Sequence, residues 1–195
     1  MSKISLDPDD KPRCFGNRPG QALYAAYHDE EWGVPVYDDR LLFEMLILEG
    51  AQAGLSWETI LKRREGYRAA YHQFDIAKVA AMDDDALDAL CEETAIIRHR
   101  LKIFAARTNA RCVMAIQKEF GSFAHYIWGF SNHSIVKNHW KDATEVPVTT
   151  ALSDALSRDL KQRGCRFVGS TIIYAYLQAV GVVNDHVTSC WRYQK

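Results

Sequence analysis

The sequence has no apolar run long enough to cross a bilayer. The densest run, residues 41–48, contains Glu44 and is followed directly by Glu49. The sequence also lacks an excess of charge of either sign, because 24 Lys and Arg residues balance 25 Asp and Glu residues to a net charge of -1. This balance excludes a protein that holds nucleic acid by bulk positive charge, so any nucleic-acid binding has to be local.

Signal-peptide features and a disulfide framework are absent as well. Residues 1–14 carry acids where a signal peptide would be apolar. The five cysteines are an odd number spread along 195 residues, at Cys14, Cys91, Cys112, Cys165 and Cys190. A chain of this length buries roughly 70% of the surface that its unfolded form exposes, so its core needs no disulfides. We expect a cytoplasmic protein without membrane attachment, in which at least some thiols are free or bound to metal.

Strand signals are scarce, whereas apolar residues recur at helical spacing along most of the chain. The sequence therefore predicts an all-α fold. Capping residues and glycines place helices at about residues 38–53, 56–71, 75–80, 83–91, 96–120, 122–130, 153–164 and 171–180. Residues 131–150 are predicted to be irregular. We expect one domain over residues 1–195, and the irregular segment leaves open a division into two helical lobes with the active-site cleft between them.

Two cysteines and two histidines near the ends of the chain form a candidate metal site: Cys14, His28, His186 and Cys190. Two thiolates and two imidazoles are a complete tetrahedral ligand set for zinc, and four protein ligands would make the metal structural. His186 and Cys190 are four residues apart, so one helical turn would face them the same way. Taken alone, this pair is more often a coincidence, a packed thiol beside a surface histidine, and the metal interpretation requires a fold that joins the two ends.

Glu49 ends an apolar helix and is followed by small residues up to Trp57. A carboxylate in such surroundings is costly unless something pairs with it. One interpretation is a structural role, in which Glu49 caps a neighbouring helix or accepts backbone hydrogen bonds. The other is a ligand site, in which Glu49 recognises a cationic planar molecule that Trp57 covers. Further aromatic residues lie upstream, at Phe15, Tyr24, Tyr27 and Trp32.

A basic helix end, a tight turn and a new helix start follow one another over residues 161–171. Backbone amides at the second helix start would bind phosphate without a large net charge, with Gly169 allowing close approach. The candidate contacts are Val168, Gly169, Ser170 and Thr171. Two other basic clusters, residues 62–64 and 98–102, are more typical of solvated helix faces.

Several blocks of the sequence together resemble the bacterial DNA-3-methyladenine glycosylase I family, which belongs to the helix-hairpin-helix superfamily. The blocks are residues 27–35, 42–45, 48–57, 96–100, 167–171 and 183–187, and the likeness extends from Arg13 to Cys190. The resemblance implies a structural zinc ion held by Cys14, His28, His186 and Cys190. It also implies a base pocket lined by Glu49, Tyr27, Trp32 and Trp57. Phe15 stands where the family has tryptophan close to the cysteine, as a further candidate contact with the base.

The resemblance further implies DNA contacts and an activity. Leu55 matches the residue that fills the gap left by an extruded nucleotide, and residues 168–171 match the hairpin that grips DNA. The expected function is hydrolytic excision of 3-methyladenine from alkylated double-stranded DNA by a monomer, with Glu49 as the catalytic candidate and without strand cleavage. Asp185 is expected to support the metal ligand His186. The alternatives are a lesion-binding protein without hydrolytic activity and a hydrolase of small molecules whose zinc keeps an open position.

Overall fold

The computed structural model describes residues 11–193, so most of the expectation about residues 1–14 lies outside the described part. The helices are α1 (Ala22–Glu30), α2 (Asp39–Gln52), α3 (Trp57–Leu61), α4 (Arg64–Ala70), α5 (Ile76–Ala81), α6 (Asp84–Leu90), α7 (Arg100–Phe120), α8 (Phe123–Gly129), α9 (Ala151–Gln162) and α10 (Ser170–Ala179). Two 3-10 helices, η1 (His72–Phe74) and η2 (Ala143–Glu145), and two short strands, β1 (Val136–Lys137) and β2 (Val183–Asn184), complete the described elements. This mostly helical fold confirms the predicted class.

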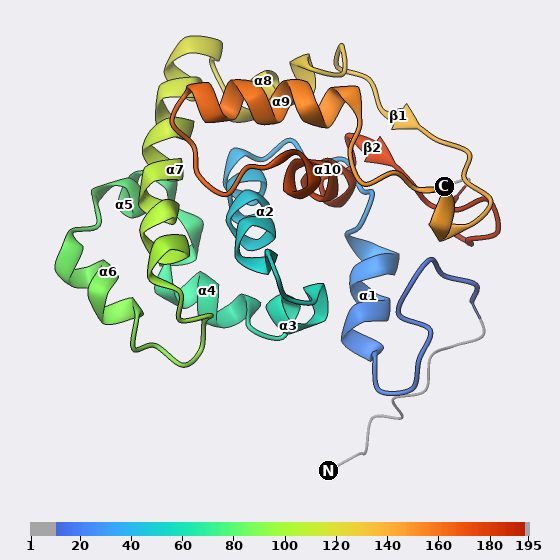
Figure 1. The fold of residues 1–195 in the computed structure, drawn as a ribbon, viewed down its shortest axis with the longest axis horizontal. Helices are drawn as coiled ribbons and strands as arrows, with labels where there is room; N and C mark the ends of the chain where they lie inside the picture. The colour runs from blue at the N-terminus through green and yellow to red at the C-terminus, as the bar shows by residue number, and fades with distance from the viewer. Residues whose placement is uncertain (1–10, 194–195) are drawn as a thin grey trace.

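The apolar helices α2 and α10 lie at the centre of the molecule (Figure 1). Helix α7 stands on one side of them, α1 lies on the other, and α9 crosses above. Most of α2 and both faces of α10 are buried in the hydrophobic core, as the apolar pattern of 171–180 predicts. None of the described helices combines the length and the apolar character that crossing a bilayer requires.

The predicted helix at 56–71 is two helices. Ser56 caps α3 as expected, because its Oγ accepts a hydrogen bond from the Thr59 amide at 3.2 Å. The chain then breaks before α4, whose first residue, Arg64, is buried and donates to Glu44 at 2.5 Å and to Glu31 at 2.6 Å. The break therefore turns Arg64 into the protein, and the expectation of a solvated basic face at 62–64 is wrong for this residue.

Three further boundaries differ from the prediction. Helix α1 was not predicted, and its N-cap, Gln21, makes no side-chain capping bond that would mark its start. Helix α7 begins at Arg100 rather than at 96, after the extended N-cap His99. Helix α9 is capped by Thr150, with Ser153 as the third helical residue of a reciprocal capping box. Ser153 was thus correctly placed at the helix start but in the wrong capping position.

The irregular segment after α8 is anchored to the end of α10. Strand β1 pairs in parallel with β2, with Val136 opposite Val183, a contact that the sequence did not predict. The buried carboxylate of Asp185 accepts hydrogen bonds from four side chains at 2.5 to 2.8 Å: Asn138, Trp140, Tyr174 and Gln178. Asp185 therefore fastens the irregular segment to α10, which corrects the expectation that it supports His186.

A disulfide links α7 to the segment between α9 and α10. Cys112 and Cys165, which lie 53 residues apart in the sequence, are bonded to each other. Cys14, Cys91 and Cys190 are free thiols, as expected for part of the set. The scattered spacing gave no signal for the bonded pair, because their proximity depends on the packing of α7 against the end of α9.

Replacing Asp185 by alanine should lower the free energy of unfolding by about 3 kcal/mol, because buried donors lose a charged acceptor. Urea denaturation measures this loss. The matched control is Asp88→Ala, which removes an exposed ion pair with Arg100 and should cost less than about 1 kcal/mol. Equal losses in the two variants would contradict the anchoring role.

Candidate functional site

The four predicted metal ligands meet in one buried cluster. Cys14 precedes α1, His28 lies in α1, and His186 and Cys190 follow β2. Their ligand atoms all lie within 4.8 Å of one another. The Cys14 sulfur is 3.6 Å from Nδ1 of His186, and the Cys190 sulfur is 3.5 Å from the same atom and 3.4 Å from Nε2 of His28. This group could hold a metal ion, and it brings both ends of the described chain together.

Neighbouring groups hold both imidazole rings in place. Asp29 contacts Nδ1 of His28 at 2.8 Å and accepts hydrogen bonds from Arg13 and Trp191. Burial opposes ionisation of Asp29, but the hydrogen bonds from Arg13, His28 and Trp191 hold its pKa well below the usual range. The backbone oxygen of Trp32 contacts Nε2 of His186 at 3.2 Å. These contacts leave Nε2 of His28 and Nδ1 of His186 facing the thiols, as metal ligation requires.

A glycine makes room for one of these rings. Gly33 has a φ of +77°, and a Cβ atom at this position would lie 3.1 Å from Nε2 of His186. A side chain here would therefore strain the backbone and crowd the imidazole. Neither this glycine nor Asp29 was predicted as part of the site, although both belong to the 27–35 block that carried the family resemblance.

Glu49 lies in the last turn of α2 and is 4% exposed. No residue in the described part of the chain donates a hydrogen bond to its carboxylate, and burial alone raises the pKa of Glu49 to about 8. The structural interpretation of Glu49, as a cap or an acceptor of backbone hydrogen bonds, is therefore wrong. An unpaired buried carboxylate is typical of a site built to bind something else.

Tyr27 lies near this carboxylate and packs against Trp57. The rings of Tyr27, from α1, and Trp57, from α3, are 5.3 Å apart. Burial raises the pKa of Tyr27 well above its usual value, and the nearby charge of Glu49 adds to the effect. The Trp57 Nε1–H is buried without a hydrogen-bond partner. Helices α1, α2 and α3 thus bring an unpaired acceptor and an unpaired donor together with aromatic surface.

The other two predicted aromatic residues connect this site to the metal cluster. Phe15 stacks on Tyr24 at 4.5 Å and meets the edge of Trp32 at 5.1 Å. Trp32 in turn packs against the ring of His186 at 4.6 Å. Trp32 is therefore placed against the metal ligands, and Phe15 lies between the two groups. Ring contacts therefore run without a break from the cluster through Trp32 and Phe15 to Tyr27.

The predicted phosphate-binding turn lies between α9 and α10 and is held from α7 and α9. The side chain of Asn109 bonds both backbone groups of Arg166, at 2.8 and 3.0 Å, and Ser157 donates to the Val168 carbonyl at 2.6 Å. No side chain caps the start of α10, so the amides around Ser170 and Thr171 have no side-chain acceptor there. Val168 itself is buried and contributes packing.

Leu55 follows α2 in a tight turn and is 41% exposed, as a residue that contacts a partner must be. Its amide donates to the Gln52 carbonyl at 2.6 Å, and Gly54 adopts a φ of +82°. This turn lies near the phosphate-binding turn, because a Cβ atom on Gly50 would lie 3.3 Å from Cβ of Phe167. The structure thus brings the two predicted DNA-contacting segments to the same side of α2.

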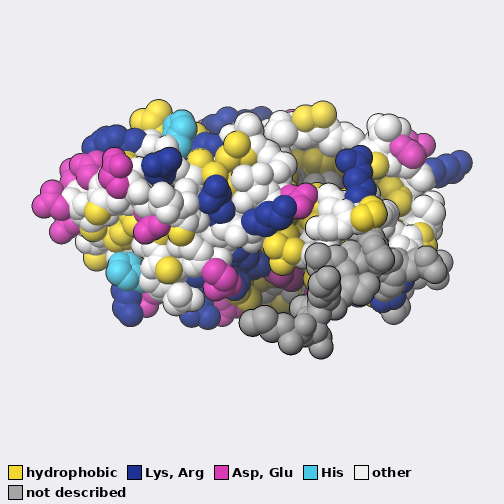
Figure 2. Space-filling model, turned by 90° about the horizontal axis from the view of Figure 1, so that it is seen from below, with side chains coloured by type: hydrophobic (Ala, Val, Ile, Leu, Met, Phe, Trp, Pro, Cys, Tyr) yellow, Lys and Arg dark blue, Asp and Glu magenta, His cyan; other side chains and the backbone are white. Residues whose placement is uncertain are grey.

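Charge does not mark a site by itself. On the face seen in Figure 2, Lys and Arg side chains are dispersed among acidic ones, and acidic side chains gather at the end that carries α6. This distribution agrees with the balanced composition, which allows nucleic-acid binding only through local groups.

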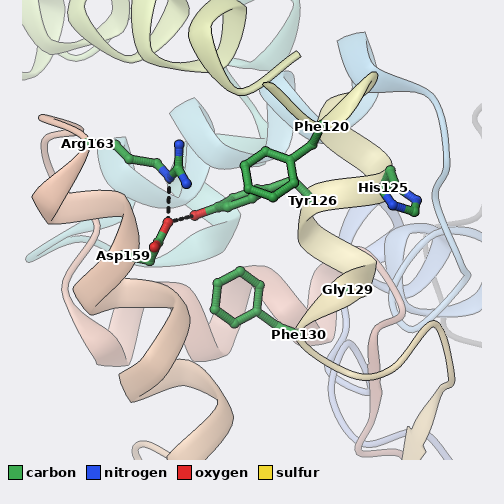
Figure 3. Close-up of a pocket in the computed structure, with 7 residues that line it drawn as sticks. All are labelled: Phe120, His125, Tyr126, Gly129, Phe130, Asp159 and Arg163. Atoms are coloured by element: carbon green, nitrogen blue, oxygen red, sulfur yellow. Dashed lines mark hydrogen bonds and ion pairs between the residues drawn. The ribbon is translucent and has the colours of Figure 1, made fainter. Parts of the chain in front are cut away.

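A cavity of about 350 Å³ lies between α8 and α9, away from the predicted site (Figure 3). Asp159 accepts hydrogen bonds from Tyr126 at 2.6 Å and from Arg163 at 2.5 Å, and Arg163 also pairs with Glu119. The charged groups at this cavity therefore satisfy one another. The network fastens α8 to α9, and the remaining titratable residue of the lining, His125, stacks on His133 with ring centroids 4.7 Å apart.

Comparisons with known proteins agree with this geometry. A family model described as methyladenine glycosylase matches residues 17–193. DNA-3-methyladenine glycosylase 1 of Escherichia coli is 51% identical over 88% of this chain and 91% of its own length, and a Haemophilus influenzae DNA-3-methyladenine glycosylase is 46% identical over 87% and 92%. A Staphylococcus aureus 3-methyladenine DNA glycosylase I, solved to explain 3-methyladenine recognition, superposes with a TM-score of 0.88 at 32% identity, over 96% of this chain and 97% of that one.

The pKa of Glu49 makes stability depend on pH. The folded protein holds this proton up to about pH 8, whereas the unfolded chain releases it near 4.5, so the folded state binds more protons between these values. Relative to Glu49→Gln, the protein should lose free energy of unfolding as pH rises from about 5 to 8, and denaturation of both proteins across this range measures the difference. A constant difference would contradict a buried, unpaired carboxyl.

Proposed function

The chain belongs to the methyladenine glycosylase family, and from this premise we propose how its own residues carry out the reaction. Its activity is excision of 3-methyladenine from DNA in base excision repair. The observation that carries the proposal is the buried Glu49 carboxylate, which lacks a hydrogen-bond donor and lies near Tyr27, whose ring packs against Trp57. These residues form the base pocket, and Phe15 and Trp32 complete its wall toward the metal cluster.

The pocket selects a base by charge and shape. Methylation at N3 gives the adenine of the nucleotide a positive charge, which an unpaired carboxylate favours and aromatic faces can stack against. Glu49 accepts hydrogen bonds from the edge of the base, while Tyr27 and Trp57 pack against the ring. Binding of a cation favours the ionised acid, so the base also lowers the raised pKa of Glu49.

Hydrolysis follows from the charge of the lesion. The bond from C1′ of the sugar to the base breaks, and the base leaves with the bonding electron pair as neutral 3-methyladenine. Water adds to C1′ and releases its proton, which completes an oxocarbenium-like pathway. Glu49 holds the base as it departs, and no protonation of the leaving group is needed because it is already cationic. None of the motifs places a lysine for Schiff-base chemistry, so the enzyme is monofunctional.

The DNA partner is alkylated double-stranded DNA, bound through local contacts. The turn between α9 and α10 acts as the hairpin of a helix-hairpin-helix motif, in which amides near Val168, Gly169, Ser170 and Thr171 bind backbone phosphate. Leu55 fills the gap left by the extruded nucleotide. We place this activity in a cytoplasmic monomer whose residues 1–195 form one domain, with the base site in the cleft between two helical lobes.

Zinc is the metal that the cluster fits best. Tetrahedral zinc, with sulfur at about 2.3 Å and nitrogen at about 2.0 Å, would separate sulfur from nitrogen by roughly 3.5 Å. The sulfur to nitrogen distances of 3.4 to 3.6 Å match this separation. Cys14, His28, His186 and Cys190 would hold the ion, whose contribution is structural, because four protein ligands leave no position for water. This argument disfavours a zinc hydrolase of small molecules.

The alternative, a lesion-binding protein that does not hydrolyse, is tested by excision with the unmodified protein, and Glu49→Gln tests the role of Glu49 in that excision. Loss of the charged acceptor should slow release of 3-methyladenine from alkylated duplex DNA by about 10- to 100-fold in single turnover. The control is Glu92→Gln, an exposed acid outside the site, which should retain the full rate. Unchanged excision in the Glu49 variant would remove this residue from the mechanism, and no excision by the unmodified protein would favour the binding protein.

Elemental analysis tests the metal proposal. Purified protein should contain about one zinc per chain, as a single four-ligand site requires. Cys190→Ser should reduce the zinc content and the melting temperature, whereas Cys91→Ser, which alters a free thiol outside the cluster, should change neither. Full stability in a protein that contains no metal would refute the structural role.

A further inference from the structure

Lys102, in the first turn of α7, reaches across to the end of α2. Its ammonium donates to the backbone carbonyl of Ala51 at 2.9 Å and to that of Ala53 at 2.6 Å. The last carbonyls of a helix have no partner within the helix, and they carry the negative end of its dipole. Helix α2 has no basic residue in its own last turn. Lys102 therefore supplies the cation that this helix end lacks.

The position of the ammonium has a cost. Desolvation lowers the pKa of Lys102, so the charge would be more stable in water. The two carbonyls offset this cost and hold the partly buried ammonium against the end of α2. A lysine that served only to attract DNA phosphate would gain nothing from such a placement, because an extended side chain projects its charge furthest.

The carbonyls that Lys102 binds flank the turn that presents Leu55. Ala53 (φ −46°, ψ 114°) and Gly54 (φ +82°) have the angles of a type II turn, which the bond from Leu55 to Gln52 closes. Within residues 11–193, no other side chain outside α2 and α3 makes a hydrogen bond to residues 52–56. The turn is thus fixed from outside by a single side chain.

We propose that Lys102 is a positioning residue for base extrusion. It holds the turn in the geometry in which Leu55 fills the gap left by the extruded nucleotide. This inference rests on the proposed role of Leu55. Lys102 acts by fixing backbone rather than by touching the lesion, so it affects steps that need the inserted leucine and spares binding of the base in the pocket. Because the turn is already ordered before DNA binds, no free energy is spent on ordering it when the nucleotide is extruded, and extrusion is faster.

The test compares Lys102→Met, which keeps the length and removes the ammonium, with Lys102→Arg, which restores donors. Lys102→Met should slow single-turnover excision from alkylated duplex DNA by about tenfold or more, and Lys102→Arg should recover most of the rate. The dissociation constant for free 3-methyladenine, measured by calorimetry, should not change. Lys118→Met, at the opposite end of α7, is the matched control and should retain the full excision rate.

A double-mutant cycle with Leu55→Ala identifies the route of the effect. If Lys102 acts through Leu55, then adding Lys102→Met to Leu55→Ala causes little further loss of rate. Additive losses would overturn the proposal in favour of direct phosphate binding. The same conclusion would follow if Lys102→Met reduced the slope of DNA affinity against salt by the amount expected for about one phosphate contact. An unchanged excision rate in Lys102→Met would also overturn the proposal. If Leu55→Ala alone leaves excision unchanged, the proposed role of Leu55 fails instead.

Discussion

The fold is organised around a carboxylate that is buried without a hydrogen bond. An unpaired acid of this kind is unfavourable, and it persists only because the surrounding structure is rigid enough to hold it. Glu49 is rooted in α2, the helix with the most buried residues near the centre of the molecule, and the walls around it come from α1 and α3. In the proposed mechanism, a cationic base supplies the missing partner, and its binding recovers the free energy given up at this position.

The cluster of Cys14, His28, His186 and Cys190 supports the proposed base site from the side of α1. Helix α1 provides both the ligand His28 and the pocket residue Tyr27, in adjacent positions of the chain. Fixing one therefore fixes the other. Phe15 and Trp32 fill the space between the cluster and Tyr27, so that the ends of the chain support the pocket without taking part in the chemistry.

Much of this arrangement could be predicted from the sequence, because the signals were local. Five helices have N-caps at the residues where their predicted ranges begin: Asp38, Ser56, Asp75, Asp83 and Ser122. Glu49 was identifiable because a charge within an apolar helix is rare. Features that depend on distant contacts were missed or misassigned: Asp185 bonds residues 45 to 47 positions away, and Lys102 bonds residues about 50 positions away. Residue types alone proposed the set that joins His28 to Cys190, and the family resemblance strengthened this weak signal.

Helix α7 fastens both segments that we propose to contact DNA, through Lys102 at the turn that presents Leu55 and Asn109 at the turn between α9 and α10. The two residues are seven positions apart, which is about two helical turns, so their side chains leave the same face of the helix. A single residue inserted between them would rotate one attachment by about 100° relative to the other. The length of this stretch therefore sets the relative orientation of the two attachments, and we expect it to tolerate substitution far better than insertion or deletion.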